Sequence, residues 1–379
     1  MAVHVSGHPA IQREQAKERG LPGGGKAHPI RDWFVERLGL RALAYPVPEH
    51  ANGLLYTLGG ITLFGFAVLI ITGIWLAQFY HPHPTQAHDS VLYIMKSAPL
   101  GDFVRGVHAW SAVVVTVTIS LHMVRVFLSG SYKAPREANW LVGLGLLAVT
   151  MGFVFTGTVA KWDQEGAEAL LHNTDIAQLL GAAGGWFSAD FSLAVPVVVR
   201  VFFAHVAILP ALLTALVIAH FFLVKVHGMA PLGRADGREA DPANTTKTAL
   251  YGEPMYPFNS HIRKIAGWGL LATSIIMALA LAFPTALGPA PIQGIEVTKP
   301  PFMYWWLYAA EDFLGLRGLL IIPAAFFLIA ASVPLIDRGR LRAIRRRKTV
   351  VILGVLFIIL LLALTAYTGL TPPVAHTQM

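Results

Sequence analysis

Two histidines lie inside one long apolar stretch of this chain, RGVHAWSAVVVTVTISLHMVRVFL (105–128). His108 and His122 are 14 residues apart, and in an α-helix 14 residues advance about 21 Å and make close to a whole number of turns. Both imidazoles therefore fall on one face of the predicted helix, one near each end. Ionisable side chains within such a segment indicate a functional site, because their burial in lipid is costly.

A second apolar stretch, RVFFAHVAILPALLTALVIAHFFLVK (200–225), carries a similar pair, His205 and His220. These two residues are 15 apart, one more than the first pair. Pro210 lies between them, and a kink at this proline can absorb the extra residue. We therefore expect both imidazoles to lie on one helix face here as well.

The whole chain has the composition of an integral membrane protein. Of its 379 residues 55% are apolar and only 13% are charged, and the mean hydropathy is +0.58, whereas soluble domains average about 25% charged residues. The absence of cysteine excludes disulfides, thiolate metal sites, iron–sulfur clusters and thioether-attached haem. We predict an all-α fold, because seven stretches are long and apolar enough for transmembrane helices. They are approximately 58–79, 106–128, 139–160, 197–224, 265–283, 318–336 and 349–370.

The basic residues indicate how these spans cross the membrane. Of the 29 Lys and Arg, 23 lie in the N-terminal region or in the second, fourth and sixth connections with the adjoining span ends. By the positive-inside rule these segments are cytoplasmic, so spans 106–128 and 197–224 both run from outside to inside. Nucleic acid is not an expected partner, because the basic residues are spread over loops on one membrane face.

The shared direction arranges the four histidines as two pairs at two depths. His108 and His205 would lie near the outer face, and His122 and His220 near the inner face. Neutral imidazoles in such pairs would bind two non-covalent haems through both axial positions. A single buried histidine is more often hydrogen-bonded to a neighbouring helix, and zinc would need three or four converging ligands. The matched pairs favour haem over both.

Glycines in the two intervening spans repeat the same period. Gly59 and Gly73 are 14 residues apart in the first span, and Gly143 and Gly157 are 14 apart in the third. A helix packed against a flat macrocycle needs a missing side chain at each haem level. Ordinary small-residue helix packing is the alternative, but it does not explain the shared period.

Three arginines lie near the predicted haem levels. Arg105 and Arg200 are close in sequence to the outer histidines, and Arg125 is close to an inner one. Guanidinium groups pair well with carboxylates such as haem propionates. Arg125 is equally consistent with a residue that extends to the cytoplasmic interface.

Six motifs in the first two thirds of the chain carry a family resemblance. They are LGGITLFGF (58–66), VHAWSA (107–112), LHMVRVFLSGSYKAPREANWLVG (121–143), AKWDQ (160–164), RVFFAHVAILPALLTALVIAH (200–220) and YGEPMYP (251–257). Together they resemble cytochrome b of the Rieske–cytochrome b complexes, the bc and b6f type. The spacing of 15 residues and the last motif resemble the plastoquinol branch, so the chain looks like a b6-like half fused to a subunit IV-like half.

The resemblance implies an organisation and an activity. Residues 1–50 would form a cytoplasmic extension with an amphipathic helix near 30–43, residues 51–232 a four-helix dihaem domain, and residues 233–379 a quinone-site domain of three helices. Quinol would be oxidised at the outer face, one electron would pass to a Rieske iron–sulfur protein and on to cytochrome c or a similar acceptor, and the other would cross two b haems to an inner quinone. The implied setting is a homodimeric complex among the lipids of a prokaryotic inner membrane.

The sequence departs from the family pattern in two places. Thr57 stands where the plastoquinol branch has the cysteine that attaches a third haem. In KPPFMYWWLYAAEDF (299–313), Pro301 replaces the glutamate of the family's Pro-Glu-Trp-Tyr motif, which helps to take a proton from quinol. A base is still needed, and we expect Glu311 or Asp312 to supply it, with Glu296 as the rival.

At the inner face, proton donors are needed where quinone is reduced. Lys225 and His227 follow the fourth span, and Asn259 and His261 precede the fifth. Loop residues in contact with water or lipid headgroups would have the same composition.

Two other functions remain open on the sequence alone. One is a dihaem electron relay that does not split the electrons of quinol, which the altered outer motif would allow. The other is a transporter without haem, in which buried histidines form a proton relay.

Overall fold

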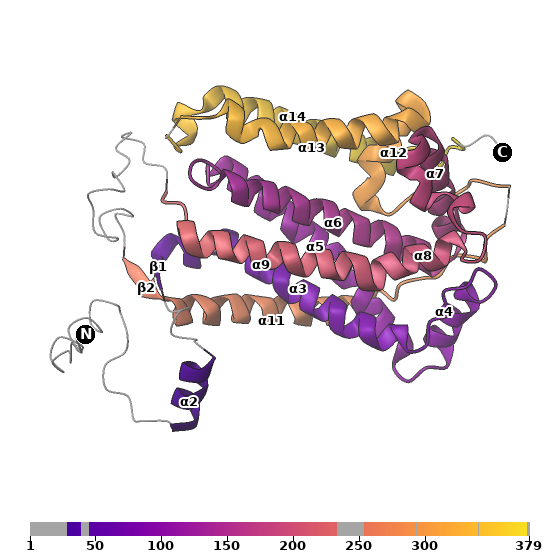
Figure 1. Cartoon of the computed structure of the whole chain (residues 1–379), viewed down its shortest axis with the longest axis horizontal. Coiled ribbons are helices and arrows are strands. Elements are labelled where there is room, and N and C mark those ends of the chain that lie inside the picture. The colour runs from indigo at the N-terminus through magenta and orange to yellow at the C-terminus, as the bar shows by residue number, and fades with distance from the viewer. Residues whose placement is uncertain (1–28, 39–44, 233–253, 293, 340, 377–379) are drawn as a thin grey trace, which may run out of the picture.

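The computed structural model describes residues 29–38, 45–232, 254–292, 294–339 and 341–376. The chain is built almost entirely from helices that lie along one long axis (Figure 1). Seven of the described helices are long and apolar enough to cross a membrane, at the spans that the sequence predicted. They are α3 (Leu54–Ala77), α5 (Gly101–Leu128), α6 (Glu137–Lys161), α8–α9 (Val197–His227), α11 (Phe258–Ala282), α13 within Phe302–Ile336, and α14 (Lys348–Leu370).

Shorter elements lie at the two ends of the bundle. At one end β1 (Pro46–Pro48) pairs antiparallel with β2 (Met255–Pro257), and α2 (Pro29–Arg37) lies beyond this pair (Figure 1). At the other end lie α4 (Ala87–Lys96), α7 (Gln164–Leu179), α12 (Trp305–Leu314) and the C-terminal tail. We call these the β end and the α7 end.

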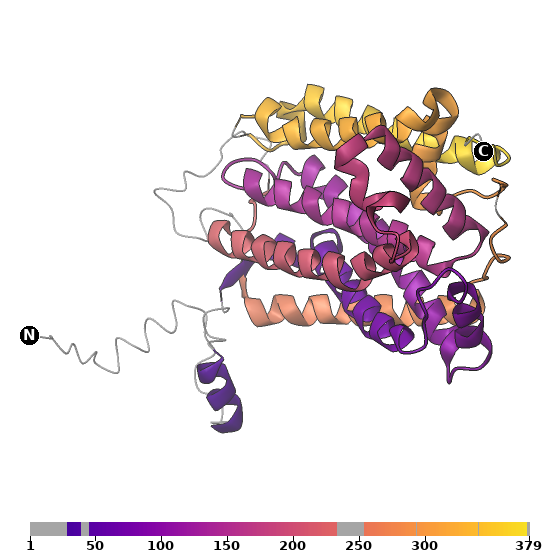
Figure 2. The ribbon, with the colours of Figure 1, turned by 45° about the vertical axis from the view of Figure 1, so that its right-hand side comes forward.

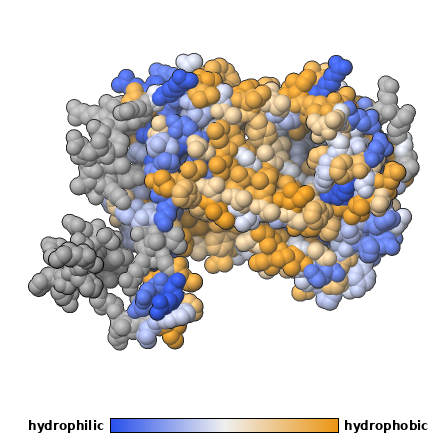
Figure 3. All heavy atoms as spheres, viewed as in Figure 1, coloured by the Kyte–Doolittle hydropathy of each residue, from blue (hydrophilic) through white to orange (hydrophobic). Residues whose placement is uncertain are grey.

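Four helices form the centre of the bundle and the last three flank it. In Figure 1 α13 (Gly318–Ile336) and α14 cover α5 and α6 on one side, while α11 lies along α3 on the other. The 45° view in Figure 2 keeps this order. Apolar side chains form a broad band around the middle, with hydrophilic side chains gathered toward the ends (Figure 3). A band of this kind suits a bilayer, because lipid hydrogen-bonds no polar group.

The central core separates two levels of the bundle. Gly65 allows close packing of α3 on α5, since an added Cβ would lie 2.4 Å from a methyl of Val115. The buried apolar cluster lies, in sequence, between the two glycines of α3 and α6 and between the two histidines of α5 and α8–α9. It comprises Phe66, Val115, Ile119, Leu146, Leu147, Val149 and Leu213.

We expected a kink at Pro210 to absorb the extra residue between His205 and His220, but a π-helical turn absorbs it instead. A π-helical turn, Ala204–Ile208, separates α8 (Val197–Phe203) from α9 (Leu209–His227) and contains His205 itself. A π turn accommodates one additional residue in a helix. Pro210 follows at once and lacks an N–H, so it weakens the regular helical ladder where the turn forms.

Two other predicted elements differ in extent. The amphipathic helix expected at 30–43 is helical over Pro29–Arg37 with Ile30, Trp33 and Phe34 exposed, and residues 39–44 lie outside the described residues. The fifth span begins at Phe258 rather than near 265, because its polar first turns are helical too. The polar linker expected at 233–247 lies outside the described part of the chain.

Candidate functional site

The four histidines of the apolar spans face one another in two pairs. The ring centroids of His108 and His205 are 6.4 Å apart, and those of His122 and His220 are 6.5 Å apart. An imidazole nitrogen binds a first-row metal at about 2 Å, and the ring centre lies about 1 Å behind that nitrogen. Two rings that bind one ion from opposite sides would therefore have centroids about 6 Å apart, which both pairs match.

Each glycine of the 14-residue pattern lies against one of these imidazoles. An added Cβ would lie 3.3 Å from Cε1 of His108 at Gly73 and 3.2 Å from Cε1 of His205 at Gly157. At the other level the same atom would lie 3.1 Å from Cε1 of His122 at Gly59 and 4.0 Å from Cε1 of His220 at Gly143. The glycines thus provide space for the rings themselves, in addition to the predicted clearance for a macrocycle.

Two threonines orient the imidazoles at the level nearer the α7 end. The hydroxyl of Thr72 donates to the carbonyl of Val68 (2.7 Å) and lies 2.9 Å from Nδ1 of His108. Because its one proton is used on the carbonyl, it must accept from Nδ1–H. The histidine is then the neutral tautomer with a free Nε2, the form that binds a metal.

Thr156 repeats this arrangement on the facing histidine. Its hydroxyl donates to the carbonyl of Gly152 (2.8 Å) and lies 2.8 Å from Nδ1 of His205. Sequence reasoning missed both threonines, although a signal was present: each directly precedes a glycine that lies against its histidine, as Thr72-Gly73 and Thr156-Gly157.

At the level of His122 and His220, no threonine hydroxyl contacts Nδ1 among the described residues. Nδ1 of His220 has no hydrogen-bond partner among the described residues, and Nδ1 of His122 lies 3.5 Å from a terminal nitrogen of Arg125. That guanidinium also stacks 4.5 Å from the ring centre of Tyr56, and its buried Nε has no partner in the described part of the chain. A buried, unsatisfied donor fits an anionic group at this level.

The other two arginines make different contacts. Arg105 donates to the carbonyls of Thr285 (2.5 Å) and Ala286 (3.0 Å). Arg200 donates to the carbonyls of Trp186 and Ser188, and its Nε is buried without a partner among the residues described. Both arginine side chains thus hold loops in place at the α7 end.

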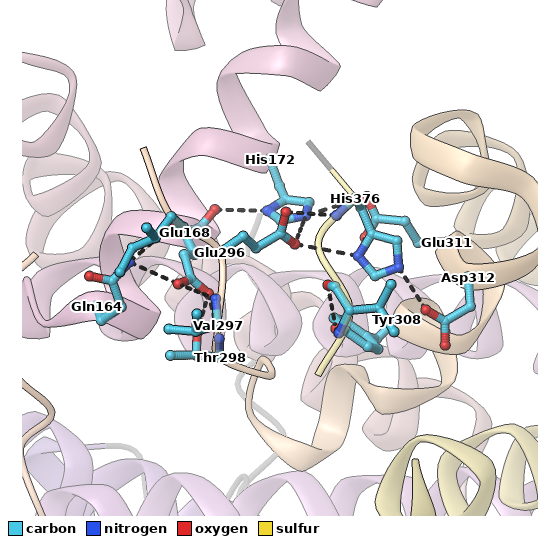
Figure 4. Close-up of polar contacts among 12 residues, drawn as sticks. Gln164, Glu168, His172, Glu296, Val297, Thr298, Tyr308, Glu311, Asp312 and His376 are labelled. Atoms are coloured by element: carbon cyan, nitrogen blue, oxygen red, sulfur yellow. Dashed lines mark hydrogen bonds and ion pairs between the residues drawn. The ribbon is translucent and has the colours of Figure 1, made fainter. Parts of the chain in front are cut away.

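A cavity of about 210 Å³ opens at the α7 end, between α7, α12 and the loop that leads to α12. Its lining includes Pro301, Tyr304, Glu296 and Glu311. The short helix α12 therefore brings Glu311 to a cavity, as the sequence argument required. Asp312 points away from it, toward the C-terminal tail (Figure 4).

The α7 helix fixes the loop over this cavity. Asp163 accepts hydrogen bonds from the N–H groups of Gly166 and Gly288, both at 3.0 Å. It therefore caps the start of α7 and ties the loop that carries Gly288 to this helix. Glu168 accepts from the N–H groups of Val297 and Thr298, both at 2.9 Å. The motif at 160–164 thus positions the wall that carries Glu296.

Two histidines that sequence reasoning missed join the three acids. Nε2 of His172 lies 3.2 Å from Glu296 and 3.4 Å from Glu311. His376 of the tail contacts Glu296 at 3.3 Å through Nδ1 and Asp312 at 2.6 Å through Nε2 (Figure 4). No sequence signal marks these histidines, because they come from α7 and the tail.

Carboxylates control the charge of both imidazoles. Burial lowers the pKa of His172, but Glu296 and Glu311 outweigh it and raise that pKa to about 10. The pKa of His376 is raised as well, because Glu296 and Asp312 outweigh the effect of burial. The ring of His172 is therefore cationic at neutral pH, which lowers the cost of three clustered acids.

The charge of His172 predicts a pH dependence of stability. A histidine whose pKa is raised on folding stabilises the fold fully below its unfolded pKa of 6.5, and this contribution is lost as pH rises through about 10. We expect His172→Gln to lower the melting temperature of the purified protein most at pH 6 and hardly at all above pH 10. A difference that is the same at both pH values would contradict the assigned charge.

A second cavity, of about 410 Å³, lies at the β end. It is lined by Glu49, Asn52, Tyr256, Ser260, Arg263 and Lys264. His261 is buried beside it, with Nδ1 3.2 Å from Oδ1 of Asn52. Lys225 and His227, predicted for the inner quinone site, are at the end of α9 and do not line this cavity.

Comparison with known proteins agrees with this architecture. The family described as Cytochrome b/b6/petB matches residues 42–228. The cytochrome bc complex cytochrome b subunit of Chlorobaculum thiosulfatiphilum is 31% identical over 336 residues, which cover 83% of this chain and 74% of the relative. The chain therefore belongs to the cytochrome b family, and this membership implies binding of b-type haem and argues against a transporter without haem.

A second relative and a solved structure show how much of this chain resembles known proteins. The menaquinol:cytochrome c reductase cytochrome b subunit of Geobacillus thermodenitrificans is 34% identical over 217 residues, 53% of this chain and 97% of the relative. A chain of a solved structure titled "Hyperthermophilic respiratory Complex III" aligns with a TM-score of 0.75 at 24% identity, over 90% of this chain and 91% of that one. The latter shows the same fold along nearly the whole chain.

Proposed function

We propose that this chain is the cytochrome b subunit of a quinol–cytochrome c reductase and holds two non-covalent b-type haems. His108 and His205 would hold one haem, and His122 and His220 would hold the other. The observation that carries this proposal is the pair of facing imidazoles at each level, 6.4 and 6.5 Å apart between ring centroids. Bound haem supplies one-electron transfer.

The side chains around these histidines have definite tasks. Thr72 and Thr156 hold the Nδ1 protons and so direct Nε2 of each outer-level histidine to the metal. Arg125, with its unsatisfied donors, would bind a propionate at the other level. The four glycines let α3 pack against the histidines of α5, and α6 against those of α8–α9, without displacing the rings.

The cavity at the α7 end is the proposed site of quinol oxidation. Two hydroxyl protons must leave when a quinol gives up two electrons, and a base must lie within hydrogen-bond reach. Glu311 lines this cavity and is 2% exposed. We assign the base to Glu311, with Glu296 beside it, in the role that Pro301 cannot fill. Proton release at this end and uptake at the β end would contribute to proton translocation.

Topology and assembly follow from the same proposal. The β end, with the N-terminus, would be cytoplasmic in a prokaryotic inner membrane, and the cavity of Asn52 would take the quinone to be reduced. Residues 51–232 would form the dihaem domain and 233–379 the quinone-site domain, after an extension at 1–50. A Rieske protein and a cytochrome c-type subunit would be the electron acceptors, in a homodimer surrounded by lipid.

Haem analysis and quinol oxidation of the purified complex test the proposal. Acid–acetone extraction and the pyridine assay should recover about two haems per chain, and a quinol should reduce them in a manner blocked by an outer-site inhibitor. Recovery of no haem, or of haem that stays on the chain, would reject the ligand assignment. Haems that accept electrons from other donors but not from quinol would favour the dihaem relay.

The threonines give a further prediction. Thr72→Val removes the acceptor for the Nδ1 proton of His108, so this imidazole becomes a weaker electron donor. We expect the midpoint potential of one haem to rise by roughly 20–60 mV, since a hydrogen bond contributes about 0.5–1.5 kcal/mol and 59 mV corresponds to a factor of ten. Redox titration should show the other haem unchanged. Thr62→Val is the matched control, because this buried hydroxyl donates to Leu58 and Thr118 and makes no hydrogen bond to a histidine.

A further inference from the structure

The C-terminal tail folds back beside the cavity at the α7 end. After α14 ends at Leu370, the tail is held by Tyr308, whose hydroxyl donates to the carbonyl of Val374 (2.9 Å) and accepts from its N–H (2.7 Å). The backbone N–H of His376 then donates to Oε2 of Glu296 (2.7 Å). The backbone of the tail is therefore held so that the imidazole of His376 lies among the acids (Figure 4).

The two imidazoles of this cluster differ in what they can transmit. His172 donates Nδ1–H to the backbone carbonyl of Glu168 (2.8 Å), and a carbonyl cannot take up a proton at ordinary pH. Only its Nε2 faces carboxylates. His172 is thus a fixed counter-charge that cannot pass a proton through its ring.

His376 has a carboxylate at each ring nitrogen. Nδ1 lies 3.3 Å from Oε1 of Glu296, and Nε2 lies 2.6 Å from Oδ1 of Asp312. Glu296 lines the cavity, whereas neither His376 nor Asp312 does. The ring therefore connects a cavity acid with an acid outside the cavity.

We propose that His376 is a proton relay that carries protons from the quinol cavity through Glu296 to Asp312. The proposal rests on the proposed function and adds an exit path to it. The carboxylic acid of Glu296 gives its proton to Nδ1 of His376, and the resulting imidazolium gives the proton on Nε2 to Oδ1 of Asp312. Each transfer breaks one bond to hydrogen and forms another, and no electron moves. The ring then turns about Cβ–Cγ, takes up the next proton at Nε2 and releases the one on Nδ1, which restores the starting tautomer.

The surroundings of His376 support a role in transfer. Glu296 faces it from the loop, Asp312, Glu311 and Tyr308 face it from α12, and the ring of His172 faces it from α7 at 6.3 Å. Oδ2 of Asp312 has no hydrogen-bond partner in the described part of the chain, so this second oxygen is available to a further acceptor once Oδ1 has taken up the proton.

The test compares variants of the full chain in the assembled complex, with quinol oxidation, haem content and solvent isotope effect measured from pH 6 to 8. His376→Gln should slow turnover roughly 100-fold, the lower end of the range for a lost acid–base group, and raise the isotope effect at unchanged haem content. In His376→Ala, added imidazole should restore turnover. Added imidazole should not restore turnover in His172→Gln, because the ring of His172 passes no proton. His81→Gln, at an exposed histidine, is the control and should resemble wild type.

The outcomes separate the relay from the function on which it rests. Wild-type turnover and isotope effect in His376→Gln would overturn the relay while leaving quinol oxidation intact. A slow His376→Ala variant with no imidazole rescue and an unchanged isotope effect would show a structural role and would also overturn it. If the wild-type complex itself does not oxidise quinol, the proposed function fails, and the relay fails with it.

Discussion

His205→Ala is expected to leave the chain with one haem instead of two and to reduce quinol-driven electron transfer by more than about 100-fold. Loss of a residue that only supports a metal ligand costs about 10–100-fold in affinity or activity, so loss of the ligand itself should cost more. His108→Ala should remove the same spectral component, because the two rings face each other at 6.4 Å. Pyridine haemochrome analysis and redox-resolved spectra measure both effects.

The other pair provides the internal comparison. His122→Ala and His220→Ala should both remove the second component and leave the first. His81→Ala, at an exposed histidine outside the spans, should keep both haems. If His108→Ala and His220→Ala removed the same component, the pairing across the bundle would be wrong.

Glu311→Gln is expected to slow quinol oxidation by roughly 100-fold, the lower end of the range for a lost general base. The amide keeps the size of the side chain but takes no proton at neutral pH. Both haems should remain and should still be reduced by dithionite, because the substitution lies in α12 and not in a haem-binding span. Steady-state turnover with a water-soluble quinol and an excess of acceptor measures the effect.

Two neighbouring substitutions show which acid receives the first proton. Glu296→Gln should have a comparable or smaller effect, since Glu296 lines the same cavity. Asp312→Asn should slow release without weakening quinol binding, because Asp312 does not line the cavity. Unchanged turnover in both Glu311→Gln and Asp312→Asn would reject α12 as the source of the base and would favour Glu296, a base from the Rieske partner, or the dihaem relay.

The sequence by itself determined the helices and the four histidines that face one another in two pairs. Apolar stretches of about 20 residues have few alternatives in a bilayer, because a helix satisfies its own backbone hydrogen bonds. Helical periodicity then places His108 and His122 on one face. The glycines could be found for the same reason, since a spacing of 14 residues is preserved when the helix forms.

Only the tertiary structure decided which side chains outside the 14-residue pattern of histidines and glycines belong to the candidate sites. Thr72 and Thr156 depend on how α3 and α6 rotate toward the histidines, and the π turn at Ala204–Ile208 takes up a residue that the spacing alone assigned to a kink at Pro210. Neither is fixed by hydrophobic patterning. The sequence favoured Glu311 or Asp312 over Glu296 as the base, but only the structure shows that Glu311 and Glu296 line the cavity and Asp312 does not.

The cluster at the α7 end shows this limit most clearly. His172, Glu296, Glu311 and His376 come from α7, a loop, α12 and the tail, and His172 and His376 are 204 positions apart in the chain. Their meeting depends on loop geometry and on the tail being held by Tyr308, which no short-range pattern specifies. Spacing along one helix can be read from sequence, whereas contacts between separate segments are set by how those segments pack.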